Sequence, residues 1–85
     1  MDIKEEISEI NPDALIADGF DEAIIGMAER INLGPIVAYS VEKIIEILMN
    51  RDGMSYEEAQ EFYDFNIVGS WMGEFTPVFV NEIKK

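Results

Sequence analysis

Two consecutive sets of helix start and stop signals, in residues 40–67, constrain the fold of this chain most. In the first set Ser40 is an N-cap, Gly53 stands just past the end, and apolar residues recur at helical spacing between them: Val41, Ile44, Ile45, Leu48 and Met49. In the second set Ser55 and Glu58 form a capping box. One face of this second helix is then formed by Ala59, Phe62, Tyr63, Asn66 and Ile67. Two helices joined at residues 52–54 predict an αα-hairpin.

Two short apolar runs precede this hairpin and predict strands. Residues 23–30 and residues 36–39 flank the turn sequence Asn32-Leu33-Gly34-Pro35, a pattern typical of a β-hairpin. Gly26 inside the first run predicts a bulge or the close approach of another backbone. Residues 76–80, which include Pro77, predict a third strand near the end of the chain.

The N-terminal residues predict a short amphipathic helix. Ile3, Ile7 and Ile10 recur at helical spacing, and Pro12 interrupts the pattern. Asn11 is placed to cap a further helical turn through residues 14–17, which Gly19 would end.

These elements predict an α+β fold. We expect a small, mainly antiparallel three-stranded sheet, made of the hairpin and the C-terminal strand, with the αα-hairpin packed on one face. A chain of 85 residues is too short for two separate cores, so residues 1–85 should form one domain. Residues 1–13 are expected as a loosely attached N-terminal helix.

The charge of the chain limits its binding partners. There are 18 acidic and 6 basic residues, which gives a formal net charge of −12. Phosphate backbones and anionic membranes would be repelled by this charge, so we expect no direct nucleic-acid or membrane binding. The N-terminal segment lacks the basic start of a signal peptide, and no apolar run reaches membrane-spanning length, so we expect a cytoplasmic protein.

The composition also narrows the chemistry. Cysteine and histidine are absent, which excludes disulfides, thiolate nucleophiles and the usual proton shuttle. The serines have no histidine to activate them, and no pair of carboxylates is marked for acid–base catalysis. We therefore predict no catalytic residues and no cofactor.

A group of three carboxylates surrounds the Gly19 turn: Asp18, Asp21 and Glu22. Carboxylate oxygens are the ligands of hard cations such as Ca²⁺ and Mg²⁺, so these residues are the candidate metal ligands. Their spacing does not match the EF-hand loop, and the alternative interpretation is a helix end followed by solvated charges.

The second predicted helix carries the candidate interaction residues. Glu57, Glu61 and Asp64 share one helix face, which is either a docking stripe for a partner or an ordinary solvated face. Phe62, Tyr63 and Phe65 cannot all point the same way on one helix. At least one of Phe65 and Trp71 is therefore a candidate for partial exposure as an interface anchor. The alternative, which a domain this small slightly favours, is that the sheet covers all of these aromatic side chains.

Several segments carry a resemblance to a known group of proteins. They are ADGFDEAIIG at residues 17–26, IIEILM at 44–49, RDGMSYEEA at 51–59, FNIVGSWMGE at 65–74 and TPVF at 76–79. Over about residues 14–80 the chain resembles a family of small uncharacterised proteins encoded by tailed bacteriophages, marine phages included. The resemblance implies a phage-derived protein in the host cytoplasm and transfers no catalytic residue.

Three functional hypotheses follow. The preferred one is a non-enzymatic protein-interaction module that binds a basic partner surface through its carboxylates. The second is a carboxylate-based metal-binding domain or enzyme that uses the residues around Gly19. The third is a structural homodimer in contact through the third strand or the Trp71 region.

Overall fold

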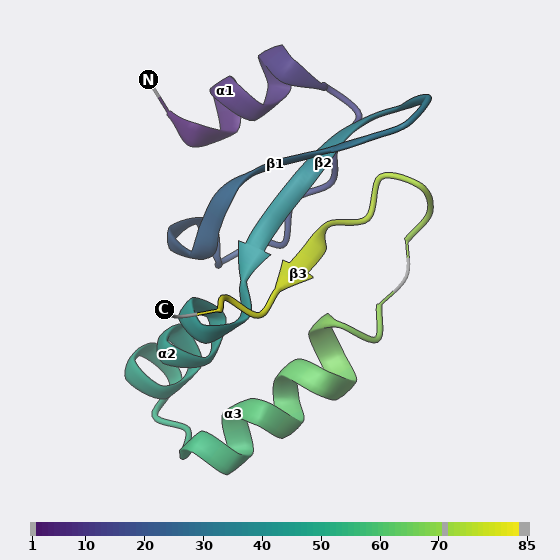
Figure 1. Ribbon diagram of the computed structural model, residues 1–85. Helices are drawn as coiled ribbons and strands as arrows, with labels where there is room; N and C mark the ends of the chain where they lie inside the picture. Colours follow the sequence, from purple (N-terminus) through teal and green to yellow (C-terminus); the bar gives the residue numbers. More distant parts are fainter. Residues whose placement is uncertain (1, 71, 84–85) are drawn as a thin grey trace.

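The structure is a computed structural model, and it describes residues 2–70 and 72–83 (Figure 1). Along the chain the elements are α1 (Ile3–Ile10), the 3-10 helix η1 (Asp21–Ala23), β1 (Ile24–Arg30), β2 (Leu33–Ser40), α2 (Val41–Asp52), α3 (Tyr56–Phe62), the π-helical segment η2 (Tyr63–Ile67) and β3 (Val78–Val80). This order of helix, two strands, two helices and one strand is the order that the sequence predicts.

The fold is α+β, as predicted, with a three-stranded sheet of order β1-β2-β3. The β1–β2 pair is an antiparallel hairpin, whereas β3 runs parallel to β2 with Phe79 opposite Tyr39. The parallel direction follows from the connection between β2 and β3. Both helices of the αα-hairpin lie in it, and the segment at residues 68–77 then returns the chain to the starting end of β2, where Arg30 bonds to the carbonyl of Glu74 (Figure 1).

The hairpin contains the predicted bulge. The pairing register shifts between Ile24 and Gly26, while no atom outside its chain neighbours lies within 4 Å of a Cβ built on Gly26. The glycine therefore marks a bulge, not a close approach of another backbone. At the hairpin turn, Arg30 donates two hydrogen bonds to the carbonyl of Gly34 and one of 2.6 Å to the carbonyl of Glu74.

Residues 14–17 differ from the prediction, because they form no helical turn. The expected cap is present, since Asn11 Oδ1 accepts a hydrogen bond of 3.1 Å from the N–H of Asp13. However, the N–H of Leu15 bonds to the carbonyl of Phe75, and that of Ala17 bonds to the hydroxyl of Tyr39. These distant partners satisfy the backbone in an extended segment, so tertiary contacts prevail over the local capping signal.

The core lies between β2 and the αα-hairpin. Val37 and Tyr39 on one face of β2 are fully buried, together with Ile44 and Leu48 of α2. From the second helix, Ala59 and Tyr63 belong to the same cluster. The buried Ile7 attaches α1 to this core, whereas Figure 1 shows α1 and α3 at opposite ends of the molecule.

Candidate functional site

The surface formed by α3 and η2 carries a large exposed aromatic side chain. Phe65 is 81% exposed, so it is an exposed member of the candidate pair, and the alternative that the sheet covers all of the aromatic side chains is wrong. Trp71 itself lies outside the described residues. Val68, one turn after Phe65, is also exposed.

The π-helical segment η2 contains both the exposed ring of Phe65 and the buried ring of Tyr63. The N–H of Val68 donates to the carbonyl of Tyr63, an i to i+5 bond of 2.9 Å. Tyr63 stays buried, with its ring edge against Phe79 at 5.7 Å. Burial, together with the adjacent carboxylate of Asp64, raises the pKa of Tyr63. Such π turns are frequent at functional sites.

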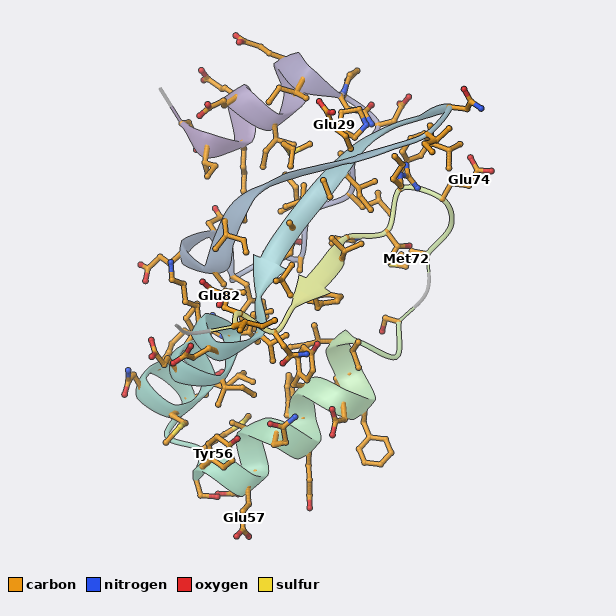
Figure 2. All side chains as sticks on the ribbon, viewed as in Figure 1. Glu29, Tyr56, Glu57, Met72, Glu74 and Glu82 are labelled. Carbon is orange, nitrogen blue, oxygen red and sulfur yellow. The ribbon has the colours of Figure 1, made fainter. Side chains whose placement is uncertain are left out.

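The predicted acidic stripe is exposed along the same helical segment. Glu57, Glu61 and Asp64 are all exposed, and Figure 2 shows Glu57 projecting from the start of α3. Between Arg51 and Lys84 the sequence has no basic residue, so these three acids have no Lys or Arg close to them in the sequence.

The first turn of α3 is fixed by the predicted capping box. The N–H of Glu58 donates to the hydroxyl of Ser55, and the N–H of Ser55 donates to the carboxylate of Glu58 at 3.0 Å. The hydrogen bond from the backbone of Ser55 lowers the pKa of Glu58. The cap therefore holds one carboxylate in place at the beginning of the acidic surface.

An apolar groove of about 390 Å³ lies beside this surface. Its walls come from three segments far apart in sequence: residues 15–20, residues 62–70 of the α3–η2 segment, and residues 72–79 before and within β3. The apolar wall residues are Leu15, Ile16, Ala17, Phe20, Phe62, Ile67, Met72, Pro77 and Phe79. Met72 at the rim is 71% exposed, so the groove opens to solvent.

Phe62 separates the groove from a second depression. Met54, Glu58, Glu61, Phe62, Phe65 and Asn66 line this depression, which we call the acidic hollow. Because Phe62 and Asn66 line both the groove and the hollow, the two form one continuous surface. The sequence placed Phe62 on the core face, yet it is 36% exposed at this boundary.

The candidate metal ligands are divided between two cavities. Asp18 borders the apolar groove, whereas Asp21 and Glu22 line a cavity between α2 and η1. One carboxylate oxygen of Asp21 lies 3.8 Å from the ammonium of Lys4. Within residues 2–70 and 72–83, no group of three or more carboxylates is placed to hold a metal ion. The structure therefore does not assemble the three residues into a metal site.

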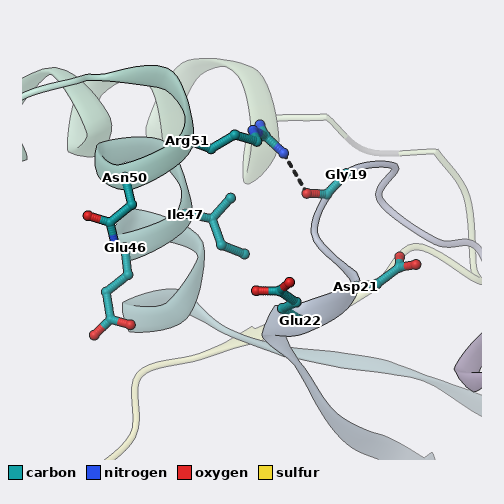
Figure 3. Close-up of a pocket in the computed structure, with 7 residues that line it drawn as sticks. All are labelled: Gly19, Asp21, Glu22, Glu46, Ile47, Asn50 and Arg51. Carbon is teal, nitrogen blue, oxygen red and sulfur yellow. Dashed lines mark hydrogen bonds between the residues drawn. The ribbon is translucent and has the colours of Figure 1, made fainter.

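The cavity between α2 and η1 already contains a cation of the protein. Figure 3 shows Arg51 reaching across from α2, where its Nη1 donates to the carbonyl of Gly19 at 2.7 Å. The same guanidinium lies over the ring of Phe20 and pairs with Asp52 at 2.9 Å. Its hydrogen bond lowers the pKa of Asp52. We interpret this arrangement as a clamp between α2 and the Gly19 turn.

The groove was not predicted from the sequence. Leu15 was assigned to a helical turn, Met72 lies in an irregular stretch, and Pro77 was assigned only to the third strand. The available signal was the presence of large apolar residues in turn-rich segments. That signal does not indicate which segments meet in space.

Comparison with known proteins found no similar protein. The sequence matches no family model, no curated protein and no solved structure. Across the described part of the chain, every helix is too short or too polar to cross a membrane.

Proposed function

We propose that this protein is a non-enzymatic interaction module that binds a basic partner protein through the surface of α3 and η2. One observation carries the proposal. Phe65 is 81% exposed in a stretch of sequence, residues 52–83, that contains acids and no bases.

An exposed aromatic ring and the surrounding carboxylates have complementary roles in such an interface. Burial of the Phe65 ring against a partner removes apolar area from water, and aromatic anchors of this kind dominate many binding energies. Glu57, Glu61 and Asp64 attract a positively charged partner and raise the association rate at low salt. The same carboxylates repel nucleic acids, which favours a protein partner.

The resemblance to tailed-phage proteins supports a setting for this interaction. A phage protein made in the host cytoplasm meets many basic proteins that bind nucleic acids. Its carboxylates could occupy the positions where those proteins bind phosphates. The proposed partner is therefore a basic protein of the host or of the phage.

A capture experiment with matched variants tests the proposal. The tagged protein is incubated with host lysate at low and moderate salt, beside two charge variants. One is Glu57→Gln with Glu61→Gln and Asp64→Asn. The other is Glu5→Gln with Glu6→Gln and Glu9→Gln, which removes the same charge from exposed positions of α1.

We expect the wild-type protein and the α1 variant to retain the same basic partner, and the α3 variant to lose most of it. Phe65→Ala should reduce retention by about tenfold, the loss expected for an interface anchor. Equal retention by both charge variants, or retention unaffected by salt, would exclude the proposed surface.

A further inference from the structure

The groove and the acidic hollow together indicate which element of the partner binds. The groove supplies apolar walls, and the hollow supplies Glu58 and Glu61 on the other side of Phe62. Asp18 adds a carboxylate at the groove. An occupant that spans both regions must therefore present apolar and basic side chains close together.

Several polar groups around the groove are already engaged within the protein. The N–H of Ala17 donates to Tyr39, and the hydroxyl of Ser70 donates to the carbonyl of Asn66 at 3.1 Å. The hydroxyl of Thr76 donates to the carbonyl of Gly73 and accepts from the N–H of Met72. Pro77 has no N–H to offer.

Because these groups are engaged, the groove favours an occupant that satisfies its own backbone. An extended peptide buried here would leave many of its own N–H and C=O groups without partners, which is costly in an apolar environment. A helix satisfies its backbone internally and presents an apolar stripe at i, i+3, i+4 and i+7.

We infer that the groove and the hollow bind a basic amphipathic helix of the partner, with its apolar stripe in the groove and Lys or Arg side chains over the acidic hollow. This inference rests on the proposed function, because it names the part of the basic partner that makes the contact. Helix-in-groove recognition of this kind depends on the spacing of the apolar residues as well as on charge.

The test uses two fluorescently labelled peptides of leucine and lysine, each about 18 residues long so that a helix can form. One has leucines at helical spacing, and the other has the same composition in scrambled order. Fluorescence anisotropy measures the binding of each peptide to the full chain at about 150 mM salt. We expect the amphipathic peptide to bind about tenfold more tightly than the scrambled one.

Variants of the protein locate the binding site. Ser70→Trp places a bulky ring at the groove wall, and the expected result is at least about a fivefold loss of affinity. Met72→Ser removes an exposed apolar side chain from the rim and should also weaken binding. Ser8→Trp, at an exposed position of α1, is the control and should bind normally. Thermal melts of all three variants show whether each is folded.

Several results would overturn the inference. Equal binding of the two peptides would show attraction by charge alone, and the proposed function would survive. Failure of both peptides to bind, while capture of a basic partner still depends on the α3 carboxylates, would reject the helix and retain the interface. A dimer in sedimentation that Ser70→Trp dissociates would assign the groove to a second copy of the chain. Failure of the proposed function is seen separately, as capture that the α3 charge variant leaves unchanged.

Discussion

The hydroxyl oxygen of Tyr39 accepts a hydrogen bond of 2.7 Å from the backbone N–H of Ala17. Tyr39 is fully buried in the core, whereas Ala17 belongs to the extended segment that forms one wall of the apolar groove. Burial raises the pKa of Tyr39, and the charges of Asp21 and Asp18 act in the same direction. The neutral Tyr39 side chain thus joins this groove wall to the core, together with the buried Phe20 of the same wall.

Removal of this hydroxyl should destabilise the fold. In Tyr39→Phe the N–H of Ala17 loses its partner, and an unsatisfied, partly buried donor costs about 1–3 kcal/mol. We expect a lower melting temperature for Tyr39→Phe in thermal denaturation. Tyr56→Phe, at an exposed position, is the matched control and should melt like the wild-type protein. Identical melting of the two variants would show that the Tyr39 hydroxyl adds no stability.

Two phenylalanines of the second half of the chain, Phe79 and Phe65, should behave oppositely. Phe79 packs between Tyr39 and Tyr63, with ring centroids 5.8 Å and 5.7 Å apart. Phe79→Ala should therefore lower the free energy of unfolding by about 2–4 kcal/mol. Phe65→Ala removes a ring that is largely in water, so its effect should stay within about 0.5 kcal/mol. Urea denaturation measures both, and a large loss in Phe65→Ala would mean that the ring is structural.

The capping box of α3 should make a pH-dependent contribution to stability. The pKa of Glu58 lies below its ordinary value of 4.5 in the folded protein. A lowered folded-state pKa means that the contribution is present above the unfolded pKa and is lost as pH falls through the folded one. Glu58→Gln should therefore melt below the wild-type protein at pH 7, and the difference should shrink as the pH falls below 4.5 and through the lowered pKa of Glu58. Glu57→Gln controls for the loss of a charge from the same turn, and a difference that persists in acid would contradict this cause.

Salt should stabilise the protein without regard to the identity of the cation. The net charge of −12 produces repulsion within the folded chain. A rise from about 10 mM to about 150 mM NaCl shortens the Debye length from about 30 Å to about 8 Å. We expect a gain on the order of 1 kcal/mol, or about 4–8 °C in melting temperature.

Divalent cations test the hypothesis that Asp18, Asp21 and Glu22 bind a metal ion. CaCl₂, MgCl₂ or MnCl₂ at matched ionic strength should change the melting temperature equally in the wild-type protein and in Asp21→Asn, because the structure divides the three candidate ligands between two cavities. A larger stabilisation of the wild-type protein by one of these ions would restore Asp18, Asp21 and Glu22 as a metal site by mass action.

The sequence predicted those features that depend on neighbouring residues. Ser40, Gly53 and Ser55 cap the helices as expected, because each cap is a hydrogen bond or a backbone angle within a few residues. Helical spacing relative to Tyr63 made Phe65 a candidate for exposure, but it did not decide between exposure and cover by the sheet.

Features that depend on distant contacts were not predictable in the same way. The extended conformation of residues 14–17 depends on Phe75 and Tyr39, which no local pattern connects to them. The parallel direction of β3 depends on the path of the whole connection between β2 and β3, which includes two helices. The groove requires all three of its walls, so it became recognisable only after their arrangement was known.

The pairing of Tyr39 with Phe79 has a consequence for how the protein folds. The β1–β2 hairpin and the αα-hairpin each join neighbouring residues, so both can form quickly. In contrast, β3 must find β2 after two helices have been ordered between them, and closure of such long loops slows folding. During synthesis the edge of β2 that receives β3 stays unpaired until residue 80 has left the ribosome. We therefore expect docking of β3 to limit the folding rate, and the incomplete sheet to be the species that aggregates.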